Sequence, residues 1–173
     1  CYVAYEAFKN IRWLFSLCHF RFRTSRIMKP KYKTAYMKTA RIFGDLSHAV
    51  RLKVGAIIVK DNRIISIGYN GMPSGWDNEC EYKHYSIGNP NDFELKSKPE
   101  VLHAETNAIA KLARSSESGF DADLFVTHSP CLDCAKLIYQ SGIRRVYYST
   151  NYRDNAGLDF LQASGVEVEK IDE

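Results

Sequence analysis

The spacing of apolar residues predicts a helix followed by a β-hairpin in the first half of the chain. Over residues 33–50, apolar side chains recur at steps of three and four, the spacing of one helix face. They are Tyr36, Ala40, Phe43, Leu46 and Val50. Residues 54–59 and 64–69 are instead short, nearly continuous apolar runs, with the turn signal Asp61-Asn62 between them. These runs predict two antiparallel strands, in a sheet that is covered on both faces.

The second half of the chain alternates between the two patterns. Helical spacing over residues 103–115, 131–140 and 156–163 alternates with short apolar runs at 124–127, 145–149 and 166–171. Such alternation predicts parallel strands that are joined by right-handed helical crossovers. With the hairpin added, the pattern predicts an α/β fold, a three-layer α/β/α sandwich around a mixed sheet of about five strands.

Residues 71–99 separate the two halves and are predicted to form a long loop. Gly71, Pro73 and Gly75 lie in its first five positions, and both residue types favour turns. A loop of this length in a compact domain is usually functional or disordered.

The first 27 residues differ in composition from the rest. They hold five Lys or Arg residues, one acid and seven aromatics, and Arg12 and His19 interrupt the apolar stretch, which argues against a secretory signal. A basic, acid-poor segment suits a targeting peptide or an arm that binds nucleic acid. The simpler interpretation is that residues 28–173 form the domain, with Met28 as a sensible start. Deleting residues 1–27 is then expected to leave activity intact.

Composition excludes some classes of protein. A chain of 173 residues with 45% apolar and 25% charged side chains is typical of one soluble globular domain. It has no run of 18 apolar residues, so no membrane span is predicted. The net charge of +4 is too small to require a nucleic-acid partner. Five scattered cysteines make a poor disulfide framework, and the close pair Cys131 and Cys134 favours metal or redox chemistry in a reducing compartment. We therefore expect a cytoplasmic protein, or one of the host cytoplasm if it is viral.

Two short motifs carry the candidate chemistry: His103-Ala104-Glu105 and Pro130-Cys131-Leu132-Asp133-Cys134. A catalytic zinc takes three protein ligands from imidazole and thiolate groups and leaves a fourth position for water. His103, Cys131 and Cys134 supply these three ligands. Both cysteines lie in the first turn of a predicted helix, where free N–H groups and the helix dipole favour thiolates.

Glu105 is predicted to move protons. Zinc lowers the pKa of its bound water to about 7. Glu105 would accept that proton as hydroxide attacks the amidine carbon of a base, and then pass protons to the ring nitrogen and the leaving ammonia. A structural zinc knuckle or a redox pair is the alternative for a C-x-x-C motif alone. A structural site needs a fourth ligand, and a redox pair does not need the H-x-E motif. H-x-E followed by P-C-x-x-C is the signature of zinc deaminases.

At these residues the sequence resembles the cytidine deaminase-like superfamily, and most closely the deoxycytidylate (dCMP) deaminases. The resemblance covers about residues 33–171, so residues 28–173 are expected to form a deaminase domain. Beyond the zinc motifs it rests on residues 51–59, on residues 134–143, and on Gly68-Tyr-Asn-Gly-Met-Pro-Ser-Gly75. The glycine-rich stretch is the discriminating one, because we do not expect it in deaminases of tRNA or of free nucleosides.

The resemblance implies hydrolysis of dCMP to dUMP and ammonia, which supplies thymidylate synthesis. It also implies a homo-oligomer, a hexamer, with activation by dCTP, inhibition by dTTP and Mg²⁺ on the triphosphate. Lys53 and Gly71 are candidate allosteric residues. The substrate contacts that it implies come from Asn70, Arg51, Ser129, Tyr152 and Ala104. Arg51 is the expected phosphate partner, because a guanidinium group matches a phosphate. The alternatives are that Asn70 only holds a turn, that Arg51 pairs with a surface acid and that Tyr152 only packs.

Some members of the family carry a second, structural zinc in the loop before the ligand histidine. Here Cys80 and His84, with Glu100 as an oxygen ligand, are the only candidates. Cys-x3-His alone is a weak signal, so we expect one catalytic zinc per chain. Near two metal ions per chain would contradict this expectation.

Two alternative functions remain open. A deaminase of tRNA or single-stranded nucleic acid would suit the basic leader, because phosphate contacts drive affinity. The mild net charge and the acidic loop make it less suitable; the acids are Asp77, Glu79, Glu81, Asp92 and Glu94. A non-catalytic zinc-binding module would keep the three ligands but would not need Glu105. Neither a nucleic-acid partner nor a membrane is therefore expected.

Overall fold

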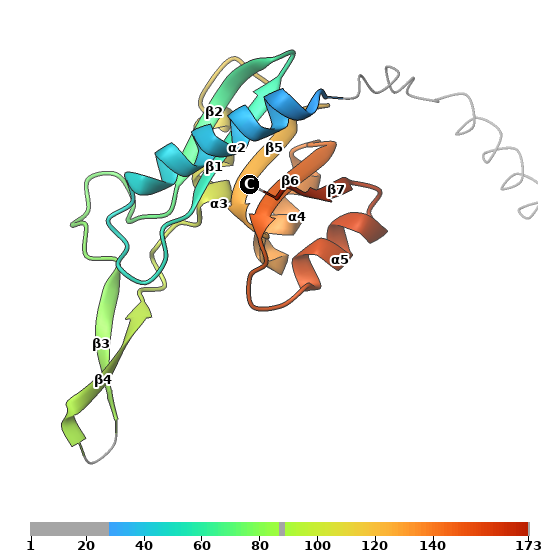
Figure 1. Cartoon of the computed structure of the whole chain (residues 1–173). Helices are drawn as coiled ribbons and strands as arrows, with labels where there is room; N and C mark the ends of the chain where they lie inside the picture. Colours follow the sequence, from blue (N-terminus) through green and yellow to red (C-terminus); the bar gives the residue numbers. More distant parts are fainter. Residues whose placement is uncertain (1–27, 87–88, 173) are drawn as a thin grey trace, which may run out of the picture.

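The structure, a computed structural model, describes residues 28–86 and 89–172 (Figure 1). The predictions for residues 1–27 lie outside this range. A five-stranded sheet forms the centre, in the order β2-β1-β5-β6-β7. The strands are β1 (Gly55–Lys60), β2 (Arg63–Tyr69), β5 (Asp123–His128), β6 (Arg145–Thr150) and β7 (Glu167–Lys170). β1 pairs antiparallel with β2 and with β5, whereas β5, β6 and β7 run parallel. The predicted mixed sheet and α/β class are confirmed.

Helices cover both faces of this sheet. The helix α2 (Pro30–Asp45) packs on one face, where Met37 and Ala40 meet Ile57 and Phe125. The helices α3 (Ala104–Ala113), α4 (Leu132–Gln140) and α5 (Ala156–Ala163) cover the other face. The alternation of side chains along each strand explains this double burial, since neighbouring positions point to opposite faces. The predicted three-layer sandwich is therefore confirmed (Figure 1).

An ion pair is buried within the central sheet. Asp123 and Arg145 are paired in register on β5 and β6, and each residue is less than a tenth exposed. Arg145 donates from Nε and Nη2 to the two carboxylate oxygens of Asp123, over 2.7 and 2.9 Å. This two-bond geometry offsets part of the cost of removing water from both charges, although burial still raises the pKa of the Asp123 carboxyl group.

Two parts of the structure differ from the sequence prediction. The first helix was predicted to run to residue 50, but α2 ends at Asp45. Leu46 and Val50 lie in the following loop, where they are 53% and 75% exposed. Their apolar spacing continued the helix pattern, although the chain has to leave the helix there to enter β1.

The second difference lies in residues 71–99, which were predicted to form a loop. They contain an antiparallel hairpin of β3 (Glu81–Ser86) and β4 (Asn89–Ser97). The two strands pair only with each other and project from the body of the domain (Figure 1). The apolar pattern missed them because the hairpin residues whose burial is described are exposed or only half-buried. Among the described residues, no helix is long and apolar enough to cross a membrane.

Candidate functional site

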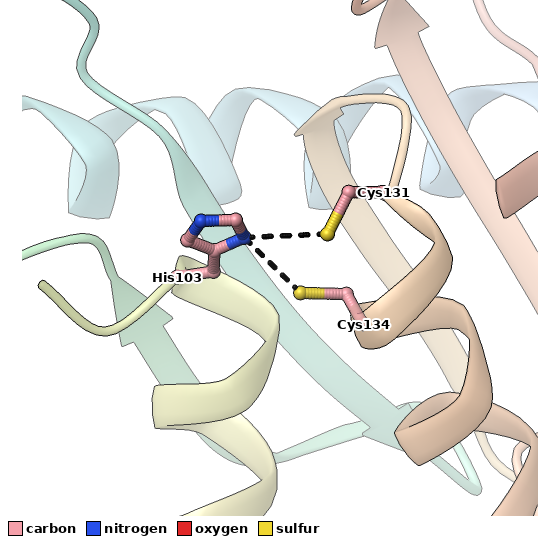
Figure 2. A group of neighbouring side chains, drawn as sticks. All are labelled: His103, Cys131 and Cys134. Atoms are coloured by element: carbon pink, nitrogen blue, oxygen red, sulfur yellow. Dashed lines mark hydrogen bonds between the residues drawn. The ribbon is translucent and has the colours of Figure 1, made fainter. Parts of the chain in front are cut away.

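The three predicted metal ligands meet at the N-terminal ends of two helices (Figure 2). His103 is the N-cap residue of α3, Cys131 is the N-cap residue of α4, and Cys134 lies in the first turn of α4. The Nδ1 atom of His103 lies 3.5 Å from the sulfur of Cys131 and 3.3 Å from the sulfur of Cys134. Their candidate ligand atoms all lie within 4.8 Å of one another.

These distances fit a zinc ion. A tetrahedral zinc with bonds of about 2.1 Å to nitrogen and about 2.3 Å to sulfur places the two donor atoms about 3.6 Å apart. The two nitrogen–sulfur distances in the structure, 3.5 and 3.3 Å, are close to that value. Three soft or borderline ligands leave the fourth tetrahedral position to water or substrate, as in catalytic zinc sites.

Close packing places the two helix ends. Gly68 on β2 faces the first turns of α3, and a Cβ atom there would collide with the carbonyl oxygen of Ala104. The side-chain amide of Asn107 on α3 donates to the carbonyl oxygen of Tyr69 over 2.9 Å. Gly157 on α5 likewise leaves room for the carbonyl oxygen of Pro130, which immediately precedes Cys131. Both ligand-bearing helix ends therefore lie directly against their neighbours.

The electrostatics of the three ligands favour a cation. Hydrogen bonds from Cys134 and His103 lower the pKa of Cys131 to about 4. The bond to Cys131, with burial, raises the pKa of Cys134, and the bond to Cys131 also raises the pKa of His103. Cys131 therefore forms a thiolate readily. Cys134 and His103 keep protons, which a bound metal ion would displace from them. The hydroxyl of Thr106 lies 3.6 Å from the sulfur of Cys134.

Glu105 lies beside the ligands and is suited to proton transfer. It belongs to the first turn of α3 and is 4% exposed. Burial, the largest effect, raises its pKa to about 7 although the neighbouring His103 opposes the shift. A carboxyl group with a pKa near neutral pH can both accept and return a proton during one reaction cycle.

A cavity of about 400 Å³ opens over this site. His103, Cys131 and Glu105 line it, and the third ligand, Cys134, is buried next to them. All the residues predicted to contact the substrate also line the cavity; they are Arg51, Asn70, Ala104, Ser129 and Tyr152. The structure therefore brings together groups that are up to about a hundred positions apart in the sequence. That they bind a nucleotide remains a prediction.

Several of these residues also bond to their own loops. Asn70 accepts a hydrogen bond from the Val54 N–H and donates one to the Leu52 carbonyl, each over 2.8 Å. These are the contacts of a residue that holds a turn, which was the alternative interpretation. The Ser129 hydroxyl accepts the Tyr152 N–H over 2.7 Å, which fixes Tyr152 at the cavity.

Among the polar residues that line the cavity, Ser97, Lys98, His128 and Arg153 were not predicted from the sequence. His128 directly precedes Ser129 and Arg153 directly follows Tyr152, so an inspection of motif neighbours could have found both. The guanidinium group of Arg153 lies over the Tyr152 ring at 5.2 Å. Ser97 and Lys98 depend on the hairpin, and no sequence motif marked them.

The residues considered for allostery and for a second zinc lie elsewhere. Lys53 donates to the carbonyl oxygen of Asp45, and Gly71 forms a β-bridge with Leu102. Cys80 is buried with its sulfur 3.6 Å from the Asn78 carbonyl oxygen, whereas His84 is exposed on β3. In the part of the chain that the structure describes, only the His103, Cys131 and Cys134 group has three neighbouring metal-binding side chains.

Comparisons with known proteins agree with the class of protein that this fold and site define, a zinc-binding hydrolytic deaminase. The sequence model of the family described as "Cytidine and deoxycytidylate deaminase zinc-binding region" matches residues 30–150. The chain therefore belongs to the cytidine and deoxycytidylate deaminase family, as the sequence predicted.

Individual relatives support the same assignment. The deoxycytidylate deaminase of Enterobacteria phage T4 is 37% identical over 166 residues, covering 76% of this chain and 86% of the relative. That of Saccharomyces cerevisiae is 33% identical over 146 residues, covering 84% of this chain and 46% of the relative. The crystal structure of the dCMP deaminase from cyanophage S-TIM5 in complex with dCMP and dUMP superposes with a TM-score of 0.75. It is 50% identical and covers 83% of this chain and 99% of that one.

Proposed function

We propose that this protein hydrolyses dCMP to dUMP and ammonia. The observation that carries the proposal is the composition of one cavity, which joins the metal ligands and Glu105 to the guanidinium-bearing residues Arg51 and Arg153. A nucleotide whose base reaches Glu105 and the metal ligands would have its 5′-phosphate near the arginines, which bind phosphate well. The solved relative in complex with dCMP and dUMP supports the same substrate.

The residues present fit one catalytic zinc per chain, held by His103, Cys131 and Cys134. Bound zinc supplies an activated water at neutral pH and polarises the group under attack. Glu105 would accept one proton from the attacking water and deliver it to the ring N3 atom of cytosine as the C4–O bond forms. It would then accept the second proton from the new hydroxyl group and deliver it to the amine, which leaves as ammonia when the C4–N bond breaks. Burial keeps the pKa of Glu105 near 7, so that it can serve as acceptor and then as donor.

Regulation and assembly are part of the proposal and rest on the family resemblance. We propose that dCTP with Mg²⁺ activates the enzyme, that dTTP inhibits it and that the chain forms a homo-hexamer. Lys53 and Gly71 are the candidate effector contacts. A cytoplasmic location, in a host cell if the protein is viral, would keep Cys131 and Cys134 reduced and able to bind metal.

The direct test is a substrate panel with the zinc-loaded protein. Ammonia release is measured from dCMP, CMP, deoxycytidine, adenosine and a cytosine-containing oligonucleotide at moderate salt. Each assay is run with and without dCTP and Mg²⁺, and with dTTP. We expect dCMP to be the preferred substrate, and preferential turnover of the oligonucleotide or of adenosine would contradict the proposal. Light scattering of the same preparation measures the oligomer.

A further inference from the structure

The strands of the projecting β3–β4 hairpin pair only with each other. At its base, however, the hairpin forms hydrogen bonds to the loop that contains Arg51. A lone two-stranded hairpin is marginally stable in water, and β3 is exposed over nearly its whole length. The first residue of β3, Glu81, lies opposite the last residue of β4, Ser97. Both residues bond to Arg51, which lies in the loop of residues 46–54 between α2 and β1. We call this segment the Arg51 loop.

Glu81 and Ser97 hold the two ends of Arg51. The backbone N–H groups of Val50 and Arg51 donate to the Oε1 atom of Glu81, over 3.1 and 3.2 Å. The Nη1 atom of the Arg51 side chain donates to the hydroxyl of Ser97 over 3.1 Å. One cross-strand pair therefore fixes both the backbone and the guanidinium group of the same residue.

Asn70 holds the Arg51 loop from its other side. Its side chain bonds to the backbone of Leu52 and Val54, each over 2.8 Å. Arg51 thus lies between two anchored segments, although it is exposed and belongs to a loop. A free arginine side chain has many rotamers, and ordering it on binding costs conformational entropy. An arginine that is already held at the cavity avoids part of that cost.

We propose that the Glu81–Ser97 pair positions Arg51 to bind the 5′-phosphate of the substrate, so that the hairpin base determines the preference for nucleotides over nucleosides. This inference rests on the proposed function, because it assumes that Arg51 faces the phosphate. Glu81 and Ser97 act through Arg51 and are positioning residues. Glu81 itself does not line the cavity, and its Oε1 atom accepts both N–H groups of the Arg51 loop.

The test compares dCMP with deoxycytidine, which lacks the phosphate. In zinc-loaded Glu81→Ala protein, we expect kcat/KM for dCMP to fall about tenfold, mainly through KM, as for the loss of a charge-assisted hydrogen bond. Turnover of deoxycytidine should stay unchanged. Glu81→Gln keeps an acceptor oxygen and should restore most of the dCMP activity. Ser97→Ala should show a smaller loss of about threefold, again for dCMP alone.

Asp92→Ala is the matched control. Asp92 also accepts a hydrogen bond, but from Ser86 within the hairpin rather than from the Arg51 loop. Thermal unfolding of both variants shows whether the fold is equally preserved. An equal loss for dCMP and deoxycytidine in Glu81→Ala would indicate a general structural role and overturn the inference. No loss for either substrate would overturn it as well.

A binding experiment separates this inference from the proposed reaction. Calorimetry with dCMP and deoxycytidine is carried out in the Glu105→Ala background, where no turnover is needed. Adding Glu81→Ala to this background should weaken dCMP binding, whereas adding Asp92→Ala should not. This result supports the positioning role even if the substrate panel identifies another reaction. Equal dCMP affinity in the two double variants overturns the positioning role and leaves the proposed deamination standing.

Discussion

The two ends of the cavity are built from different kinds of structure. One end, which we call the inner end because Glu105 is only 4% exposed there, is formed by His103, Cys131 and Glu105 at the starts of helices that pack on the central sheet. At the mouth, Arg51 lies in a loop and is held by an exposed two-stranded hairpin. Metal coordination and proton transfer need fixed geometry, which the packed helix ends supply. Recognition of a charged group at the mouth needs only a few anchored side chains.

Because the two ends belong to different segments, we expect that they can be altered separately. Changes at the inner end should abolish the chemistry for every substrate, whereas changes at the mouth should alter the choice between substrates. The five predictions below test that separation, in order of decreasing expected effect.

Replacing Glu105 should have the largest effect on turnover. In Glu105→Gln the side chain keeps its size but cannot accept and return a proton, so kcat should fall about 10³-fold. Both dCMP and deoxycytidine should be affected equally, since the proton transfer does not involve the phosphate. Zinc content, measured by metal analysis, should stay near that of the unaltered protein. Retained deamination would contradict the assigned role of Glu105.

Breaking the buried ion pair should reduce stability without a selective effect on either end. Asp123→Ala leaves the Arg145 guanidinium buried and unpaired, which should lower the free energy of unfolding by about 3–5 kcal/mol. Denaturant unfolding measures the change. The ratio of kcat/KM for dCMP to that for deoxycytidine, measured where the variant is folded, should not move. A shifted ratio would show that the sheet and the mouth are coupled.

Removing the guanidinium group at the mouth should change substrate preference. In Arg51→Ala, kcat/KM for dCMP should fall about tenfold to a hundredfold, because hydrogen bonds to charged groups are stronger than neutral ones. Deoxycytidine should be processed as before, since it has no phosphate to lose contact with. Steady-state kinetics with both substrates measure the split. An equal loss for both would place Arg51 outside the phosphate site.

The hydroxyl of Thr106 should affect the zinc affinity of the three ligands. It lies 3.6 Å from the Cys134 sulfur, and groups that contact a metal ligand orient it and adjust its charge. Thr106→Val removes the hydroxyl at constant size and should weaken zinc affinity about tenfold. Chelator competition measures the affinity, and the Co²⁺-substituted protein should show a shifted sulfur-to-metal absorption band. Thr106→Ser should restore the zinc affinity and the absorption band. If Thr106→Val leaves both unchanged, the hydroxyl does not act on Cys134.

The smallest effect is expected from the N-terminal segment. Deleting residues 1–27 should leave kcat and KM for dCMP unchanged, because the described residues from position 28 onward already supply a complete cavity and three metal ligands. The truncated and full-length chains are compared with the same substrate panel. A folded truncation that has lost turnover would show that the segment contributes to the active enzyme.

The pattern of residues along the chain was enough to predict a zinc-dependent deaminase and most of its fold. The H-x-E and P-C-x-x-C spacings predicted the roles of His103, Cys131, Cys134 and Glu105, because zinc accepts few ligand types and the reaction needs a nearby proton carrier. Alternating apolar patterns identified the five strands of the central sheet and the helices on its two faces, since buried strands and amphipathic helices leave strong periodic signals. These features depend on local spacing, which a single sequence displays.

The contacts around Arg51 at the mouth of the cavity became visible only in the tertiary structure. The described side chains of the β3–β4 hairpin form no buried face and therefore give no apolar period to detect. The helix α2 ends before its apolar pattern does. The pairing of Glu81 with Ser97, and the bonds of both to Arg51, join segments that are 30 and 46 positions apart. Such contacts depend on which segments fold back on one another, and polar residues in exposed segments leave no pattern along the chain that reveals them.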